Sequence, residues 1–249
     1  GNIVDNATVI FDQSTNGTFA GNISGTGALL NLGAGSLTLS GRNSYTGGTT
    51  ITTGTLIGNS QSLTGNIVDN AFLTFDQSNT AVIQSNDAVF AGRISGTGAF
   101  TKQGSSSLTL TGENNYQGGT TISAGALIGN KQSLIGNIVD NASLIFDQST
   151  DATFSGNISG SGNVIKNNAG KLILAGLNTF TGGTITNAGQ LQLGLSTTSD
   201  NTAPTTSSAS LVPTNFNPAA LNFKLPPPMQ FAPPPTTSFA GPSGPQVLN

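Results

Sequence analysis

The chain is built on a long internal repeat that occurs three times with little change. The segments GNIVDNATVIFDQS, GNIVDNAFLTFDQS and GNIVDNASLIFDQS begin at Gly1, Gly65 and Gly136. The first two copies are 64 residues apart and the last two are 71 apart, and the seven extra residues fall within AVIQSNDAVF, residues 81–90. A repeat that accepts an insertion at one point and nowhere else is typical of stacked structural units with a loop extending from one of them.

Alternation of side chains within each copy predicts β-strands. In the first copy, Ala7, Val9 and Phe11 alternate with positions that vary freely between copies. The matching restricted positions of the other copies are Ala71, Leu73 and Phe75, and then Ala142, Leu144 and Phe146. A period of two with one restricted face indicates half-buried strands. Glycine and asparagine recur between these strands, where corners of the chain require positive φ.

The repeat length predicts how the strands are arranged. Each copy divides into three segments of about 21 residues, the length of one coil of a parallel β-helix. We therefore predict an all-β fold, a parallel β-helix (β-solenoid) of about nine rungs over residues 1–194. Its three repeats are 1–64, 65–135 and 136–194. Equivalent side chains are expected to stack in columns around one dry interior.

The end of the chain has a different composition. All 11 prolines lie between Pro204 and Pro245, and residues 195–249 are rich in proline, serine and threonine. This composition predicts a disordered or extended linker or tail. Because the chain begins inside repeat sequence, we also expect it to be a fragment or a processed product.

The composition excludes several functional classes. Only 7% of the residues are charged and the net charge is −3, so the chain lacks the basic surface that nucleic-acid binding needs. The absence of cysteine excludes a disulfide scaffold and thiolate metal sites. No apolar run approaches the roughly 20 residues of a membrane helix. We expect no cofactor, no bound metal, no nucleic-acid partner and no membrane insertion by this segment.

Catalysis without histidine or cysteine would have to use carboxylates. The aspartates that recur once per copy are Asp5, Asp69 and Asp140, and then Asp12, Asp76 and Asp147. Equivalent members are expected about three coils, or roughly 14 Å, apart, whereas glycosidase pairs need about 5 to 9.5 Å. Turn capping is therefore the favoured role, and no catalytic residue is assigned. Calcium binding by the Asp-Asn pairs and ice binding by the threonines at 49–53 and 120–123 are weaker interpretations.

A signature in each copy points to a family. LTLSGRNSYTGGTTITTGTLIG (37–58), LTLTGENNYQGGTTISAGALIG (108–129) and LILAGLNTFTGGTITNAGQLQLG (172–194) resemble the passenger-associated strand repeat of bacterial autotransporters. The polar and aromatic motif positions are filled by Asn43, Asn114 and Asn178, and by Tyr45, Tyr116 and Phe180. The resemblance implies a right-handed parallel β-helix displayed on, or released from, the outer membrane surface of a Gram-negative cell.

These observations lead to an expected function. We expect a non-catalytic stalk or adhesin segment, surface-exposed or secreted, that contacts a protein or glycan of a host or neighbouring cell. A self-assembling extracellular filament that associates through its solenoid ends is the alternative, and a polysaccharide-cleaving β-helix is less favoured. Candidate partner contacts are the outward positions Ile10, Phe72 and Ile145, and Val82, Ile83 and Val89 of the insertion.

Overall fold

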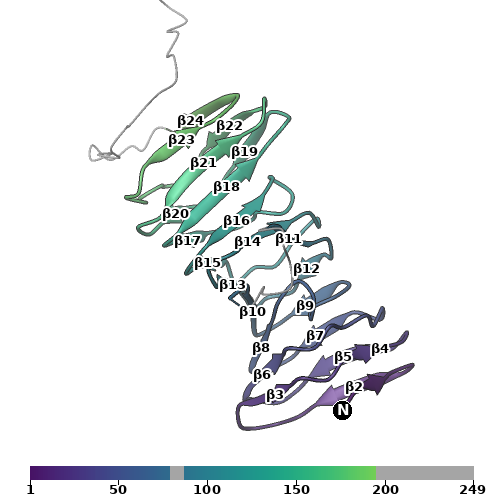
Figure 1. The fold of residues 1–249 in the computed structure, drawn as a ribbon. Coiled ribbons are helices and arrows are strands. Elements are labelled where there is room, and N and C mark those ends of the chain that lie inside the picture. The colour runs from purple at the N-terminus through teal and green to yellow at the C-terminus, as the bar shows by residue number, and fades with distance from the viewer. Residues whose placement is uncertain (79–86, 195–249) are drawn as a thin grey trace, which may run out of the picture. The chain divides into compact units, whose positions relative to one another are not determined.

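The computed structural model describes residues 1–78 and 87–194, and it is built from strands and turns (Figure 1). Every pairing between the described strands is parallel, as between β2 (Thr8–Phe11) and β5 (Ala28–Asn31). Within these ranges we find no helix that is long and apolar enough to cross a membrane. The proline-rich tail predicted at 195–249 lies outside the described residues.

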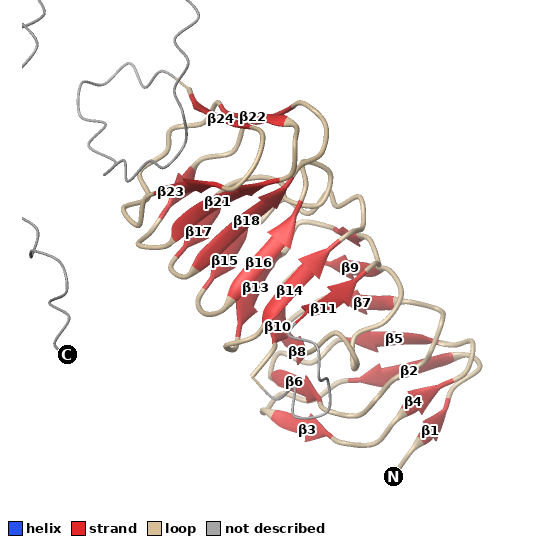
Figure 2. Ribbon diagram, turned by 45° about the horizontal axis from the view of Figure 1, so that its top comes forward, coloured by secondary structure: helices blue, strands red, loops and turns tan. Residues whose placement is uncertain are grey.

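The strands form five parallel sheets, in which the neighbours of each strand belong to the adjacent coils (Figure 2). The two-stranded sheet contains β1 (Ile3–Val4) and β4 (Ile23–Ser24). The five-stranded sheet contains β2, β5, β7 (Thr49–Ile51), β9 (Ile67–Asp69) and β12 (Ile94–Ser95). The eight-stranded sheet contains β3 (Gly17–Phe19), β6 (Ser36–Leu39), β8 (Thr55–Gly58), β10 (Phe72–Asp76), β13 (Ala99–Gln103), β15 (Thr120–Ile122), β17 (Ile138–Asp140) and β20 (Ile158–Ser159). The six-stranded sheet contains β11 (Asp87–Phe90), β14 (Ser107–Leu110), β16 (Ala126–Gly129), β18 (Ser143–Asp147), β21 (Asn163–Asn167) and β23 (Thr184–Thr186). The three-stranded sheet contains β19 (Ala152–Phe154), β22 (Lys171–Leu174) and β24 (Gln190–Leu193).

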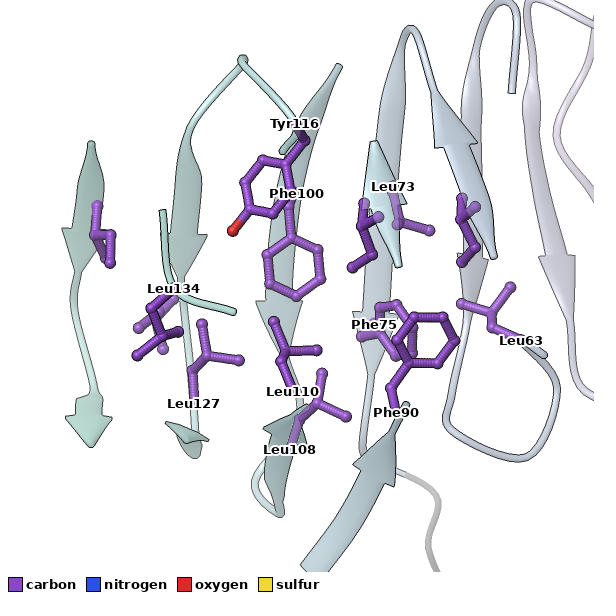
Figure 3. Close-up of a cluster of buried hydrophobic side chains, with 14 of the residues drawn as sticks. Leu63, Leu73, Phe75, Phe90, Phe100, Leu108, Leu110, Tyr116, Leu127 and Leu134 are labelled. Atoms are coloured by element: carbon purple, nitrogen blue, oxygen red, sulfur yellow. The ribbon is translucent and has the colours of Figure 1, made fainter. Parts of the chain in front are cut away.

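Alternate side chains of these strands point into a continuous apolar interior. Phe75 and Phe146, at matching positions of the second and third repeats, have no exposed surface, as the alternation predicts. Phe11 of the first coil is partly buried and packs against the same core. Figure 3 shows Phe75, Phe90 and Phe100 close together, and the ring centroids of Phe75 and Phe90 lie 4.9 Å apart in an edge-on arrangement. Burying each such ring stabilises the fold by about 2 kcal/mol.

The coils are shorter than 21 residues, and that part of the prediction is wrong. The strand register joins Val9 to Leu29, Leu29 to Thr49 and Thr49 to Ile67, so three coils take 58 residues. The parallel β-helix of about nine coils is confirmed. The 21-residue coil assumed that each repeat closes after a whole number of coils, and the register shows that it does not.

The 64-residue repeat therefore exceeds three coils by six residues, which carry the chain on to the next side of the helix. The strands β2, β10 and β18 occupy the same position in successive repeats, yet they lie in the five-, eight- and six-stranded sheets. The strands β7, β15 and β23 are distributed in the same way. Equivalent side chains of the three repeats thus face three different sides, which corrects the expectation that they stack in one column.

Candidate partner-binding surface

The outer face of the six-stranded sheet carries an unbroken column of side chains, nearly all aliphatic. The register places one outward residue of each strand beside the next, in the order Val89, Thr109, Ile128, Ile145, Ile165 and Ile185. We call these six residues the apolar column. Because parallel strands lie about 4.8 Å apart, the column is on the order of 24 Å long. Its end residues Val89 and Ile185 are 53% and 45% exposed, and the four between them are partly buried.

The eight-stranded sheet allows a direct comparison, because the same repeat positions form a column there with different side chains. That column runs through Thr18, Thr38, Ile57, Thr74, Thr101 and Thr121. Four of its threonines correspond to Val or Ile in the apolar column, whereas Thr38 and Ile57 correspond to Thr109 and Ile128. The fold accepts threonine at these positions. An exposed apolar surface that the fold does not require is typical of a site of contact with another molecule.

The structure brings together only some of the residues proposed from the sequence as partner contacts. Val89 and Ile145 both lie in the apolar column. Ile10 and Phe72 are 57% and 59% exposed, but they belong to the five- and eight-stranded sheets and do not extend that column. The expectation that Ile10, Phe72 and Ile145 share one face is therefore wrong.

The remaining predicted contacts, Val82 and Ile83, lie outside the described residues. Sequence reasoning also misses Ile128, Ile165 and Ile185, which complete the column. The outward alternation of their strands is visible in the sequence. Their alignment with Ile145 depends on the coil length, which the assumed 21-residue coil places in a different register.

The motif asparagine and aromatic residues face inward and hold neighbouring coils together. Asn114 Oδ1 accepts the main-chain N–H of Ile94 at 2.8 Å, and its Nδ2 donates to the carbonyl of Ser133 at 2.8 Å. The Tyr116 hydroxyl lies 2.6 Å from the Thr120 hydroxyl, and burial raises the pKa of Tyr116 to about 12. These motif residues are buried and do not present a binding site to solvent.

The recurring aspartates also lie inside the solenoid. Asp69 and Asp140 have no exposed surface, and each accepts the N–H of the residue two positions later, Ala71 or Ala142, at 3.0 Å. The second carboxylate oxygen of each has no hydrogen-bond partner, and burial raises the pKa of both groups to about 6. Both carboxyl groups are therefore inaccessible to a polysaccharide. In the part of the chain that the structure describes, no three potential metal ligands gather.

Two lysines are buried in equivalent corners of the second and third repeats. The Lys102 ammonium group donates to the carbonyls of Gln103, Gly104 and Ala124 at 2.8, 2.9 and 3.1 Å, and burial lowers its pKa to about 8. Lys166 makes the same kind of contacts, and its pKa is also lowered by burial. These charges serve the fold and are not available to a partner.

The buried carboxyl groups predict that the solenoid is most stable in mild acid. A carboxyl whose pKa is raised on folding stabilises the fold below its unfolded pKa of about 4, and this contribution is lost as the pH rises through about 6. We expect the chain to lose about 2 kcal/mol of unfolding free energy per carboxyl group between pH 4 and pH 7. Asp140→Asn should remove about half of this loss, as measured by urea denaturation across that range.

The double variant Asp69→Asn/Asp140→Asn is the matched test of this pH dependence. The two carboxyl groups lie in different sheets, so their effects should add and the double variant should show an almost flat profile. Lys102 titrates above this range, because its pKa is about 8. Equal slopes in the unaltered chain and in the double variant would contradict the assignment.

Comparison with known proteins links the repeat to a family. The Passenger-associated-transport-repeat family matches residues 32–57, 100–128 and 164–193. The Adhesin BmaC autotransporter of Brucella suis biovar 1 (strain 1330) is 36% identical over 161 residues, which make up 54% of this chain. The chain spans only 5% of the length of that protein. No solved structure matches the chain.

Proposed function

Because the chain is an autotransporter passenger segment built on passenger-associated repeats and is surface-exposed or secreted, we propose that it acts as a rigid, non-catalytic stalk with an adhesive face. The stacked interior supplies the rigidity, since each coil is hydrogen-bonded to the next through parallel strands. The printed name of the similar Brucella protein, an adhesin, supports an adhesive role for this chain as well.

The observation that carries this proposal is the apolar column. Its Val and Ile side chains stand where the eight-stranded sheet has threonine, so they are exposed without being required by the fold. A column on the order of 24 Å long offers a continuous apolar contact to a protein on a host or neighbouring cell. The partly buried Ile145 and Ile165 lie at its centre, where residues contribute most to binding.

The test replaces these two central residues by the side chain that the fold uses elsewhere. Ile145→Thr/Ile165→Thr should weaken attachment of the chain to cultured animal cells about tenfold, because it removes apolar contact area without leaving a cavity in the core. The matched control is Ile57→Thr, which makes the same chemical change on the eight-stranded sheet. The measurement is cell attachment of beads coated with each variant, over a range of chain densities.

Two results would contradict the proposal. The first is equal attachment of the double variant and the unaltered chain, which would show that the apolar column contacts no partner. The second is clustering of the coated beads with one another while none attaches to cells, which would favour the filament alternative. A dependence of that clustering on Ile145 and Ile165 would identify the column as a contact between copies of the chain.

A further inference from the structure

A second surface feature lies on the three-stranded sheet and does not involve the apolar column. A depression of about 460 Å³ is lined by Lys131, Asp151, Ala152, Thr153, Lys171 and Ile173. Lys131, Asp151 and Lys171 follow one another at 20-residue intervals, the length of one coil. Positive, negative and positive side chains therefore succeed each other on three adjacent coils, about 4.8 Å apart along the helix.

The main chain holds this arrangement in place. The N–H of Lys171 donates to Asp151 Oδ1 at 2.9 Å, and the N–H of Lys131 donates to Oε1 of the buried Gln148 at 3.0 Å. Gln148 in turn donates from Nε2 to the Thr150 hydroxyl at 3.2 Å. Within residues 1–78 and 87–194, the two ammonium groups of Lys131 and Lys171 have no hydrogen bond or ion pair. The site thus presents two unpaired cations on a fixed backbone.

The charges are not needed by the fold. The first repeat has Asn16, Ser36 and Ser60 at the positions of Asp151, Lys171 and Lys131. Asn16 Oδ1 accepts the N–H of Ser36 at 2.9 Å, the same contact that Asp151 makes with Lys171. A neutral side chain therefore satisfies this hydrogen bond, and the charge of Asp151 is additional.

Positive charge is also concentrated at this depression. Charged residues form only 7% of the chain. The described lysines and arginines that are not buried are Arg42, Arg93, Lys131 and Lys171. Two of these four line the same depression, where the structure has no need of them. This coincidence of free cations, a hollow and dispensable charge indicates a ligand site.

We propose that this depression binds a carboxylated sugar unit of a surface glycan, a uronic acid or a sialic acid. The ammonium groups of Lys131 and Lys171 donate to the sugar carboxylate in charge-assisted hydrogen bonds. The carboxylate of Asp151 accepts sugar hydroxyl groups, and Ile173 beside Thr153 offers an apolar contact to the C–H face of the ring. A simple inorganic anion fits poorly, because Asp151 between the lysines repels it.

The experiment measures binding of defined probes to the full chain by calorimetric titration. The probes are 3′-sialyllactose and a glucuronate-terminated disaccharide, compared with neutral lactose and with inorganic phosphate. Binding of either acidic sugar, with none of lactose, is expected, and the stronger of the two identifies the sugar class. Lys131→Ser and Lys171→Ser should each weaken binding about tenfold or more, because each removes a charge-assisted hydrogen bond. Arg42→Ser is the control, since it removes an exposed cation elsewhere.

Asp151→Asn separates sugar recognition from simple anion attraction. It keeps an oxygen for the Lys171 N–H, as Asn16 does for Ser36, and removes the negative charge. A carboxylated sugar held through its hydroxyl groups should bind several-fold more weakly, whereas a simple anion would bind more tightly. The proposal is overturned if neither acidic sugar binds, if lactose binds equally, or if phosphate competes and gains affinity in Asp151→Asn. Because none of these variants alters the apolar column, the outcome is independent of the cell-attachment test.

Discussion

Asn114→Ala is expected to lower the free energy of unfolding by about 4 kcal/mol, a large effect for one polar side chain. The side chain of Asn114 connects three successive coils, because it accepts from Ile94 and donates to Ser133 while its own N–H donates to Gln132 at 2.9 Å. Alanine leaves the N–H of Ile94 and the carbonyl of Ser133 without these partners in a buried environment. Each such loss costs about 1–3 kcal/mol. Urea denaturation followed by circular dichroism measures the change.

Asn178 provides the internal control for this prediction. It occupies the same motif position and accepts from Ile158 at 3.1 Å, but its Nδ2 donates within its own turn, to Leu174 at 3.4 Å and Gly176 at 2.9 Å. It therefore bridges one coil boundary instead of two. Asn178→Ala should cost about half as much as Asn114→Ala. Equal losses at the two sites would show that bridging of coils is not the reason why the motif requires asparagine.

The strands could be predicted from the sequence because burial depends on local alternation. Phe75 and Phe146 are inside, as their spacing from Leu73 and Leu144 indicates, and the comparison of three copies makes that pattern unambiguous. The neighbours of each strand could not be predicted in the same way. They depend on the number of residues in each turn of the coil, and the turn residues fix that number through hydrogen bonds that no local pattern reveals.

Both surface sites show the consequence of this difference. Ile145 and Ile165 are found as outward residues from the sequence, but their adjacency follows only from a 20-residue coil. The same holds for Asp151 and Lys171, which are separated by 20 residues and joined by a hydrogen bond. With a 21-residue coil, each pair is displaced by one residue, and a displacement of one residue turns a side chain to the opposite face of the sheet. The candidate sites therefore needed the register, whereas the core did not.

Coil spacing also depends on glycine at the point of closest approach between coils, and this leads to the second large predicted effect. A Cβ atom on Gly156 would lie 1.8 Å from the carbonyl oxygen of Gly136, which is one coil away. Main chain cannot yield to this extent without separating the coils. We expect Gly156→Ala to lower the free energy of unfolding by about 3 kcal/mol. Gly17→Ala is the control, because nothing lies within 4 Å of the added Cβ there and the change should be smaller than about 1 kcal/mol.

Hydrogen exchange can locate the damage that Gly156→Ala causes. In a stacked fold each coil contacts only its neighbours, so a local separation should not spread along the whole solenoid. The amides that pair β17 with β20, at Ile138 and Ile158, should exchange faster in the variant. Those between β5 and β7 should keep their protection, since they belong to distant coils. Uniformly faster exchange at both places would mean that the solenoid unfolds as one unit, and that the close approach of Gly156 to Gly136 controls the stability of every coil.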